Sequence, residues 1–227
     1  MNSRLIISLV SFLALLNAPS YALSTDTRIE GAKQCTRALA RSEREYGIPS
    51  HLLSAISMTE TGRYHKALGL SRPWPWTINV EGKGYYYDSK EEAVAAVQKF
   101  QRNGARSIDI GCMQVNLIHH ADAFATLEDA FTPSTNVAYA ASFLRGLFNE
   151  TGSWKKASAH YHSKTPSLGS KYVGKVYDRW TTIVARLRDA KAAVPKSTMA
   201  ALKDDSYNTT TRPVNLVMKK DQGKQNI

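Results

Sequence analysis

The chain has 227 residues, of which 30 are Lys or Arg and 19 are Asp or Glu, so its formal net charge is +11. This length suffices for one well-buried domain and excludes a chain of several domains. The basic balance indicates an anionic partner, such as nucleic acid, an anionic membrane face or an acidic cell-wall polymer, and says nothing about the fold.

The N-terminal segment has the pattern of a secretory signal peptide. Arg4 supplies a positive charge, residues 5–16 form an uncharged and mostly apolar run, and Ser20 and Ala22 place small residues at a cleavage site. The apolar run is shorter than the about 20 residues that a membrane-spanning helix needs, so we expect no stable membrane anchor. We therefore predict removal of residues 1–22 and a periplasmic protein, with secretion as the alternative. For an exported protein a wall polymer is a better partner than nucleic acid.

The helix predicted at residues 49–63 carries a glutamate on its apolar face. Leu52, Ile56 and Glu60 recur at i, i+4 and i+8, which places the Glu60 carboxylate on the stripe that should face the core. Apolar surroundings disfavour the charged form, so we expect a raised pKa of the kind that a general acid needs. The alternative is a helix-end glutamate that reaches water or pairs with Arg63.

The rest of the chain is also predicted to be mostly helical, with one β-hairpin. The hairpin is expected at residues 77–80 and 85–88 around the glycine-bearing loop 81–84. By apolar periodicity and capping residues, the other helices are expected at 28–46, from 89 through 100, from 132 to 151, at 154–162 and at 172–193. Residues 23–193 then form the domain, and the polar, basic residues 194–227 are expected to be a disordered tail.

The two cysteines, Cys35 and Cys112, would lie in an oxidising compartment after export, where a disulfide can form and persist. A bridge closing so long a loop would stabilise the fold by about 4 kcal/mol in the chain-entropy model. Two buried free thiols are the alternative. Histidines 119, 120, 160 and 162 do not have the spacing of metal ligands, so we expect no metal and no other cofactor.

Two further stretches carry polar groups suited to a binding site. In the run from Asp109 to Asn116, a glycine followed by Met113 and Gln114 indicates close approach of the backbone to a ligand, with an amide available for hydrogen bonds. Tyr161, near the end of a predicted helix, could present its hydroxyl to the same site. Taken alone, the first stretch is more typical of a core turn with an exposed Gln, and Tyr161 is more typical of core packing.

Together, the Glu-Thr-Gly at residues 60–62, the run 109–116 and Tyr161 resemble the lytic transglycosylase domain of the soluble type. The resemblance covers residues 35–180 and extends to the subset with a Pro/Trp-rich hairpin inserted after the catalytic helix. It implies a mainly α, goose-type-lysozyme-like fold with a small β-hairpin beside the active-site cleft. It also implies binding of peptidoglycan and cleavage of the β-1,4 bond between N-acetylmuramic acid and N-acetylglucosamine.

By the same resemblance Glu60 is the single catalytic acid, and the substrate-side residues are Thr61, Met113, Gln114, Asn116 and Tyr161. The chain departs from the family pattern where Thr61 replaces a serine and His162 replaces an asparagine. One acid suffices because the sugar's own C6 hydroxyl displaces the leaving group, which gives a 1,6-anhydro end. If the reaction uses a second carboxylate, Asp109, Glu81 and Asp88 are the candidates.

Three alternatives remain beside the transglycosylase: a hydrolytic muramidase of the same fold, a non-catalytic wall-binding module, and a basic nucleic-acid binder, which the signal peptide disfavours. Wall turnover and service to a cell-envelope secretion or motility machine fit the enzyme equally. The hairpin aromatics add a further hypothesis. We expect at least one of Trp76, Tyr85 and Tyr87 to line the glycan cleft and stack on sugar faces, the alternative being that they pack the hairpin down.

Overall fold

The structure is a computed structural model that describes residues 21–65 and 70–193. The expected tail at 194–227 and all but the last two residues of the expected signal peptide lie outside these ranges. The chain divides into two units, residues 1–185 and residues 186–227. The first unit holds both hydrophobic cores, and of the second unit the structure describes the exposed end of one helix.

The described part is mainly helical, as predicted. The helices are α1 (Tyr21–Glu45), α2 (Leu52–Thr61), α3 (Lys90–Arg102), α4 (Leu127–Ala130), α5 (Pro133–Thr151), α6 (Trp154–His162) and α7 (Pro166–Ala192). Helix α7 begins six residues earlier than predicted, because Pro166 suits the first turn of a helix and the early turns pack tightly. A Cβ at Gly169 would lie 2.7 Å from the Ser163 carbonyl oxygen.

The strands form two small antiparallel sheets. Strands β1 (Arg63–His65) and β2 (Leu70–Arg72) pair with each other. The second sheet has the order β4-β3-β5-β6, with β3 at Thr77–Val80, β4 at Lys83–Tyr86, β5 at Ile108–Ile110 and β6 at Val115–Asn116. The sequence predicted the β3–β4 hairpin but not its two partner strands.

The turn of the predicted hairpin is tighter than expected. Strand β4 begins at Lys83 rather than at Tyr85, so the loop consists of Glu81 and Gly82 alone. Their φ angles of 51° and 89° lie in the left-handed region that a two-residue hairpin turn with matching twist requires. This register pairs Ile78 with Tyr85 and leaves β3 free to pair with β5 on its other edge.

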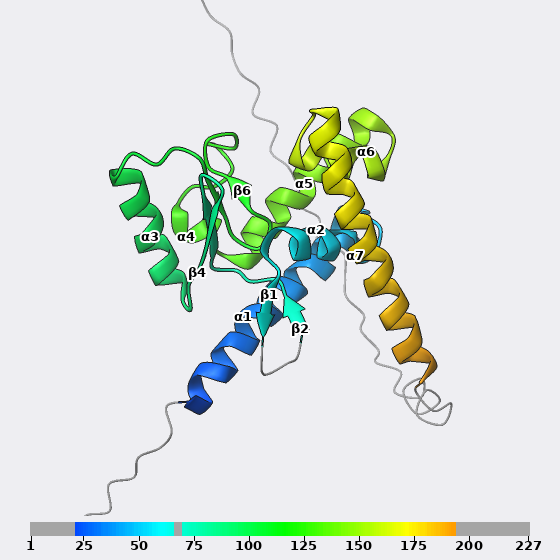
Figure 1. Ribbon diagram of the computed structural model, residues 1–227, viewed down its shortest axis with the longest axis horizontal. Helices are drawn as coiled ribbons and strands as arrows, with labels where there is room; N and C mark the ends of the chain where they lie inside the picture. Colours follow the sequence, from blue (N-terminus) through cyan, green and yellow to red (C-terminus); the bar gives the residue numbers. More distant parts are fainter. Residues whose placement is uncertain (1–20, 66–69, 194–227) are drawn as a thin grey trace, which may run out of the picture. The chain divides into compact units, whose positions relative to one another are not determined.

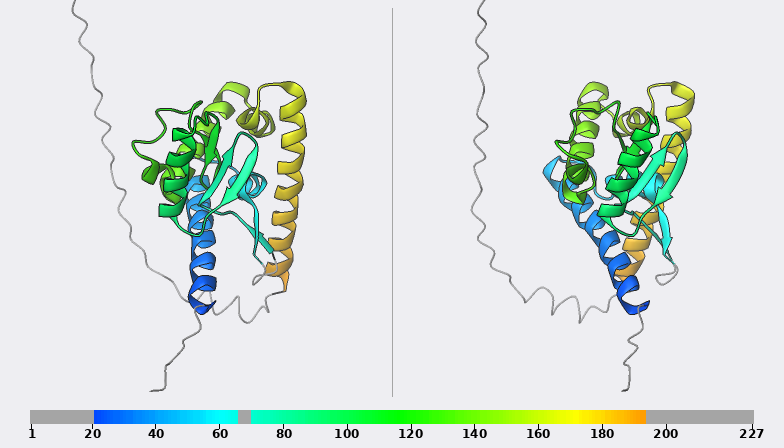
Figure 2. Two further views of the ribbon diagram at one scale, coloured as in Figure 1. Left: turned by 60° about the vertical axis from the view of Figure 1, so that its left-hand side comes forward. Right: turned by 90° about the vertical axis from the view of Figure 1, so that its left-hand side faces the viewer.

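Two hydrophobic clusters form the interior. The first core packs α2 against α1, α5, α6 and α7, and includes the fully buried Leu52, Leu53 and Ile56. The second core packs the four-stranded sheet against α3 and α4. Figure 1 shows the sheet and α3 on one side of α2 and α7 on the other, and Figure 2 gives the same elements from two more directions. The C-terminal end of α2 therefore lies between the two packed regions.

A disulfide joins Cys35 on α1 to Cys112, in the turn after β5, across 77 residues of sequence. Both sulfur-bearing side chains are fully buried. The bridge therefore ties α1 to the turn that leads into Gln114 and Asn116. No helix in the described ranges is long and apolar enough to cross a membrane.

Candidate active site

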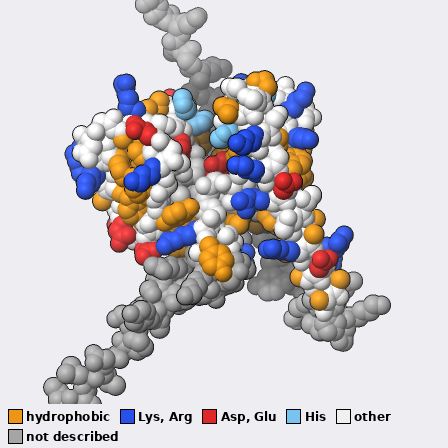
Figure 3. Space-filling view, in the orientation of Figure 1, with side chains coloured by type: hydrophobic (Ala, Val, Ile, Leu, Met, Phe, Trp, Pro, Cys, Tyr) orange, Lys and Arg blue, Asp and Glu red, His pale blue; other side chains and the backbone are white. Residues whose placement is uncertain are grey.

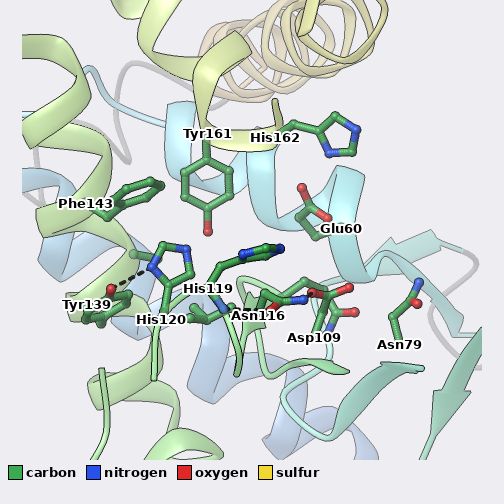
Figure 4. Close-up of a pocket in the computed structure, with 13 residues that line it drawn as sticks. Glu60, Asn79, Asp109, Asn116, His119, His120, Tyr139, Phe143, Tyr161 and His162 are labelled. Carbon is green, nitrogen blue, oxygen red and sulfur yellow. Dashed lines mark hydrogen bonds between the residues drawn. The ribbon is translucent and has the colours of Figure 1, made fainter. Parts of the chain in front are cut away.

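A pocket opens at the C-terminal end of α2, between the sheet and helices α5 and α6 (Figure 4). Its polar and ionisable lining residues are Glu60, Asn79, Asp109, Gln114, Asn116, His119, His120 and His162. Its aromatic and aliphatic lining residues are Val115, Tyr139, Ala140, Phe143 and Tyr161. In the space-filling view of Figure 3, acidic and histidine side chains lie along a hollow in the surface.

The predicted glutamate lies in the last turn of α2, in the wall of this pocket. The apolar stripe that carries it is buried, as its spacing predicted, and Glu60 itself is only partly exposed. Burial of the carboxyl group raises the pKa of Glu60 to about 7, opposed by a hydrogen bond from Tyr172 and helped by the nearby charge of Asp109. A large share of Glu60 is therefore protonated near neutral pH, as a general acid must be.

Tyr172 is a direct partner of Glu60 that the sequence patterns did not predict. Its hydroxyl, reaching from α7, donates a hydrogen bond of 2.5 Å to Oε1 of Glu60. Burial and the Glu60 carboxylate raise the pKa of Tyr172 well above its usual value, so the hydroxyl keeps its proton. The His162 ring stacks on the Tyr172 ring at 4.5 Å with an interplanar angle of 6°, which holds the tyrosine from the pocket side.

A second carboxylate, Asp109 on β5, lines the same pocket. The pairing of β5 with β6 sets Asp109 opposite Asn116, whose Nδ2 donates to Asp109 Oδ1 at 2.7 Å. Burial raises the pKa of Asp109, and this hydrogen bond lowers it. Asn116 also donates to Ser107 Oγ and accepts at Oδ1 from the backbone N–H groups of residues 118 and 119. Its hydrogen-bonding capacity is therefore spent on positioning Asp109 and the following turn.

The glycine and glutamine of the predicted motif are explained by the turn between β5 and β6. Gly111 has a φ of +81°, and a Cβ there would lie 2.3 Å from Nδ2 of the buried Asn136. Gln114 also has a left-handed φ of 48°, and its Nε2 donates to the carbonyl oxygens of Thr77 and Gly111 at 3.1 and 3.3 Å. With both amide hydrogens used, Gln114, which lines the pocket, keeps Oε1 as its acceptor.

Tyr161 on α6 lines the pocket beside an aromatic group that consists of Tyr139, His120 and Phe143. Its hydroxyl donates to the Met113 carbonyl oxygen at 2.9 Å, and its ring lies 5.8 Å from that of Phe143. Next to them the Tyr139 hydroxyl and Nδ1 of His120 are hydrogen-bonded at 2.8 Å, as drawn in Figure 4. Tyr139, His120 and Phe143 were not predicted as site residues, because their side chains meet only through the packing of α5 against the turn after β6.

Five of the expected substrate-side residues lie away from the pocket lining. Thr61 is buried, and its Oγ1 donates to the Ser57 carbonyl oxygen at 3.0 Å. Met113 is fully buried in the first core. The hairpin aromatics Trp76, Tyr85 and Tyr87 pack against the second core instead of lining the pocket. The remaining expected residues, Glu60, Gln114, Asn116 and Tyr161, are brought together there.

The pocket suits an organic polar ligand. Within the part of the chain that the structure describes, no three His, Cys, Asp or Glu side chains are grouped so that they could hold a metal ion. The pocket wall combines the carboxyl groups of Glu60 and Asp109 with amide and aromatic side chains, a combination suited to a ligand with hydroxyl groups and apolar ring faces.

The model of the transglycosylase SLT domain family matches residues 37–179 of the chain. The comparison with curated proteins and the comparison with solved structures gave no match. The family match extends from α1 into α7 and includes every pocket residue discussed above. Because it spans more than half of the chain, the protein belongs to the transglycosylase SLT domain family, whose members are typically lytic transglycosylases that act on peptidoglycan.

Proposed function

We propose that this protein is a peptidoglycan lytic transglycosylase that cleaves the β-1,4 bond between N-acetylmuramic acid and N-acetylglucosamine. The observation that carries the proposal is the Glu60 carboxyl group, which lines the pocket and has its pKa raised by burial to about 7. Family membership supports the same reaction. The signal-peptide pattern of residues 1–22 supports a periplasmic location.

In the proposed reaction Glu60 acts first as an acid and then as a base. Tyr172 donates to Oε1 of Glu60, so the transferable proton is carried on Oε2. Glu60 gives this proton to the glycosidic oxygen as the bond to C1 of the muramic acid breaks. The resulting carboxylate takes the proton from the C6 hydroxyl of the same sugar, whose oxygen bonds to C1 and closes a 1,6-anhydro ring. Glu60 is thereby protonated again, and water is not consumed.

The substrate contacts in this proposal come from the pocket lining. Gln114 offers its free Oε1 to a hydroxyl or amide N–H of the sugar, and Tyr161 accepts through the hydroxyl that donates to Met113. The aromatic group at the α5 side supplies an apolar face for a sugar ring. Asn116 acts indirectly, through Asp109.

A hydrolytic muramidase is the second candidate, because Asp109 lines the same pocket as Glu60. In that case Asp109 would activate a water or stabilise the developing cation, as the second carboxylate does in most glycosidases. The transglycosylase is favoured because members of the matching family are typically lytic transglycosylases.

The change Glu60→Gln tests the proposal, because it removes the transferable proton at nearly constant volume. We expect cleavage of purified peptidoglycan to fall by at least about 100-fold, while strand binding and the melting temperature stay close to those of the wild type. Glu91→Gln is the matched control, since Glu91 is an exposed residue in the first turn of α3. Cleavage retained in the Glu60 variant would refute the mechanism, and a wild type that binds strands without cleaving them would indicate a binding module.

A further inference from the structure

Helix α7 carries a stripe of three exposed cations, Lys171, Lys175 and Arg179, which we call the α7 basic stripe. The four-residue spacing sets successive side chains about 6 Å apart on neighbouring positions of one helix side. In Figure 3 a line of basic side chains follows α7 next to the hollow in the surface.

The α7 basic stripe borders the pocket. Lys171 immediately precedes Tyr172, whose hydroxyl reaches Glu60. Lys175 is close enough to His162, a residue of the pocket wall, for its charge to act on the imidazole. The end of the stripe with Lys171 and Lys175 is therefore the part next to the pocket, and Arg179 follows one helical turn farther along α7.

The charges of this stripe are not neutralised by other described residues, in contrast with an equally spaced stripe on α1. There, Lys33 and Arg37 pair with Glu30, and Arg41 pairs with Glu45. Among residues 21–65 and 70–193, none of the three α7 cations forms an ion pair, although the exposed Asp178 is on the same helix. An unpaired row of cations attracts an anionic ligand and raises its local concentration.

We propose that the α7 basic stripe is a docking surface for the stem peptides of peptidoglycan, binding their free carboxylates while the glycan strand occupies the pocket. This inference rests on the proposed function and adds a specificity to it. The peptides are attached to the muramic acids of the strand itself, so they emerge beside the site of cleavage. The sugars of a peptide-bearing strand are uncharged, because their amines are acetylated and the lactyl carboxyl groups of the muramic acids are amide-linked to the peptides. The basic stripe is therefore complementary in charge to the peptides.

The test is a binding titration in the full chain carrying Glu60→Gln, which removes cleavage from the measurement. Soluble peptidoglycan strands are compared with the same strands after an amidase has removed their peptides. The test variant adds Lys171→Gln, Lys175→Gln and Arg179→Gln. The control variant adds Lys33→Gln, Arg37→Gln and Arg41→Gln, which removes the same net charge at the same spacing on α1. Gln has good helix propensity, and melting curves compare the two triple variants.

We expect the α7 triple variant to lose about tenfold in affinity for peptide-bearing strands. The loss for peptide-free strands should be at most about twofold, because amidase leaves each muramic acid with a single lactyl carboxylate in place of the several carboxylates of its peptide. Tenfold corresponds to about 1.4 kcal/mol, which three exposed ion pairs can supply together. The dependence of affinity on salt should also weaken, because screening acts on these pairs. The control triple variant should bind both strands as the parent does, and Lys175→Gln alone should give about a twofold loss.

Equal losses on both kinds of strand, or equal losses in the two triple variants, would overturn the inference. It would also be overturned if the α7 triple variant bound both strands normally and lost binding to phosphatidylglycerol vesicles, since the stripe would then serve an anionic membrane. None of these results depends on cleavage. Failure of the proposed reaction would appear separately, in the digestion products.

Discussion

The hydroxyl of Tyr172 donates to Oε1 of Glu60 across 112 residues of sequence. The bond joins the last turn of α2 to the second turn of α7 and occupies one of the two carboxyl oxygens. It favours the charged form and so lowers the pKa of Glu60, while burial raises it. The two effects together set the pKa of the acid near neutral pH.

Tyr172→Phe should shift the pH profile and lower the rate. Without the hydrogen bond the pKa of Glu60 rises above about 7, so the decline of kcat/KM at high pH should begin at a higher pH than in the wild type. We expect kcat to fall about tenfold, because the acid is no longer oriented. Tyr177→Phe, at a half-buried tyrosine of the same helix, is the control. An unchanged profile in Tyr172→Phe would show that the bond does not govern the acid.

Asp109→Asn separates the two candidate reactions. The Asp109 charge contributes to the raised pKa of Glu60, so its removal should move the high-pH decline of kcat/KM to a lower pH. If Glu60 acts alone, the rate on the acid side of the profile should change by less than about tenfold. Asp122→Asn, at an exposed position, should leave the profile unchanged. A loss of about 100-fold or more in Asp109→Asn would identify a second catalytic carboxylate.

The bond between Cys35 and Cys112 should be detectable in protein purified without a reducing agent. Thiol counting on the denatured, unreduced chain should find no free thiol. Reduction should lower the melting temperature, because the unfolded chain loses a constraint equivalent to about 4 kcal/mol in the chain-entropy model. Replacing both cysteines by Ala should reproduce the melting temperature of the reduced form. Two free thiols in the unreduced protein would contradict the bridge.

The hairpin aromatics are now expected to stabilise the fold rather than to bind glycan. The ring centroids of Tyr85 and Phe100 are 5.0 Å apart, and Trp76 and Tyr87 pack against the same second core. Each change to Ala should therefore lower the unfolding free energy, by about 2 kcal/mol for side chains that are partly exposed. Strand binding per folded molecule should not change. Weakened binding with an unaltered melting temperature would instead place the residue in the glycan cleft.

The local patterns of the sequence were sufficient to predict most helices and the place of Glu60 on the buried face of α2. The bounds of α6 were predicted to the residue, since Ser153 and the following apolar spacing define both ends. The i, i+4 and i+8 pattern of α2 predicted that Glu60 would share a face with buried residues. Helix bounds and apolar faces depend on residues within one or two helical turns of each other, so they can be predicted from the local sequence.

The features that were missed depend on contacts distant in sequence. Strands β5 and β6 are three and two residues long, too short to show alternation. They form because β5 pairs with the free edge of β3, and β6 then pairs with β5. Tyr172 has the pattern of a core residue on α7, and its contact with Glu60 follows from how α7 packs beside α2. The hairpin aromatics were assigned to the cleft because they follow Glu60 closely in sequence, but the sheet directs them to a separate core.

The most direct test of the account is the mass spectrum of peptidoglycan digested by the wild-type protein. Transglycosylation by Glu60 predicts muropeptides with a 1,6-anhydro-muramoyl end, each lighter than its hydrolytic counterpart by the mass of one water and inert to borohydride reduction. The Glu60→Gln protein, assayed at the same concentration, should release none of them. Reducing ends that take up oxygen from heavy-oxygen water would contradict the account and identify the protein as a hydrolytic muramidase.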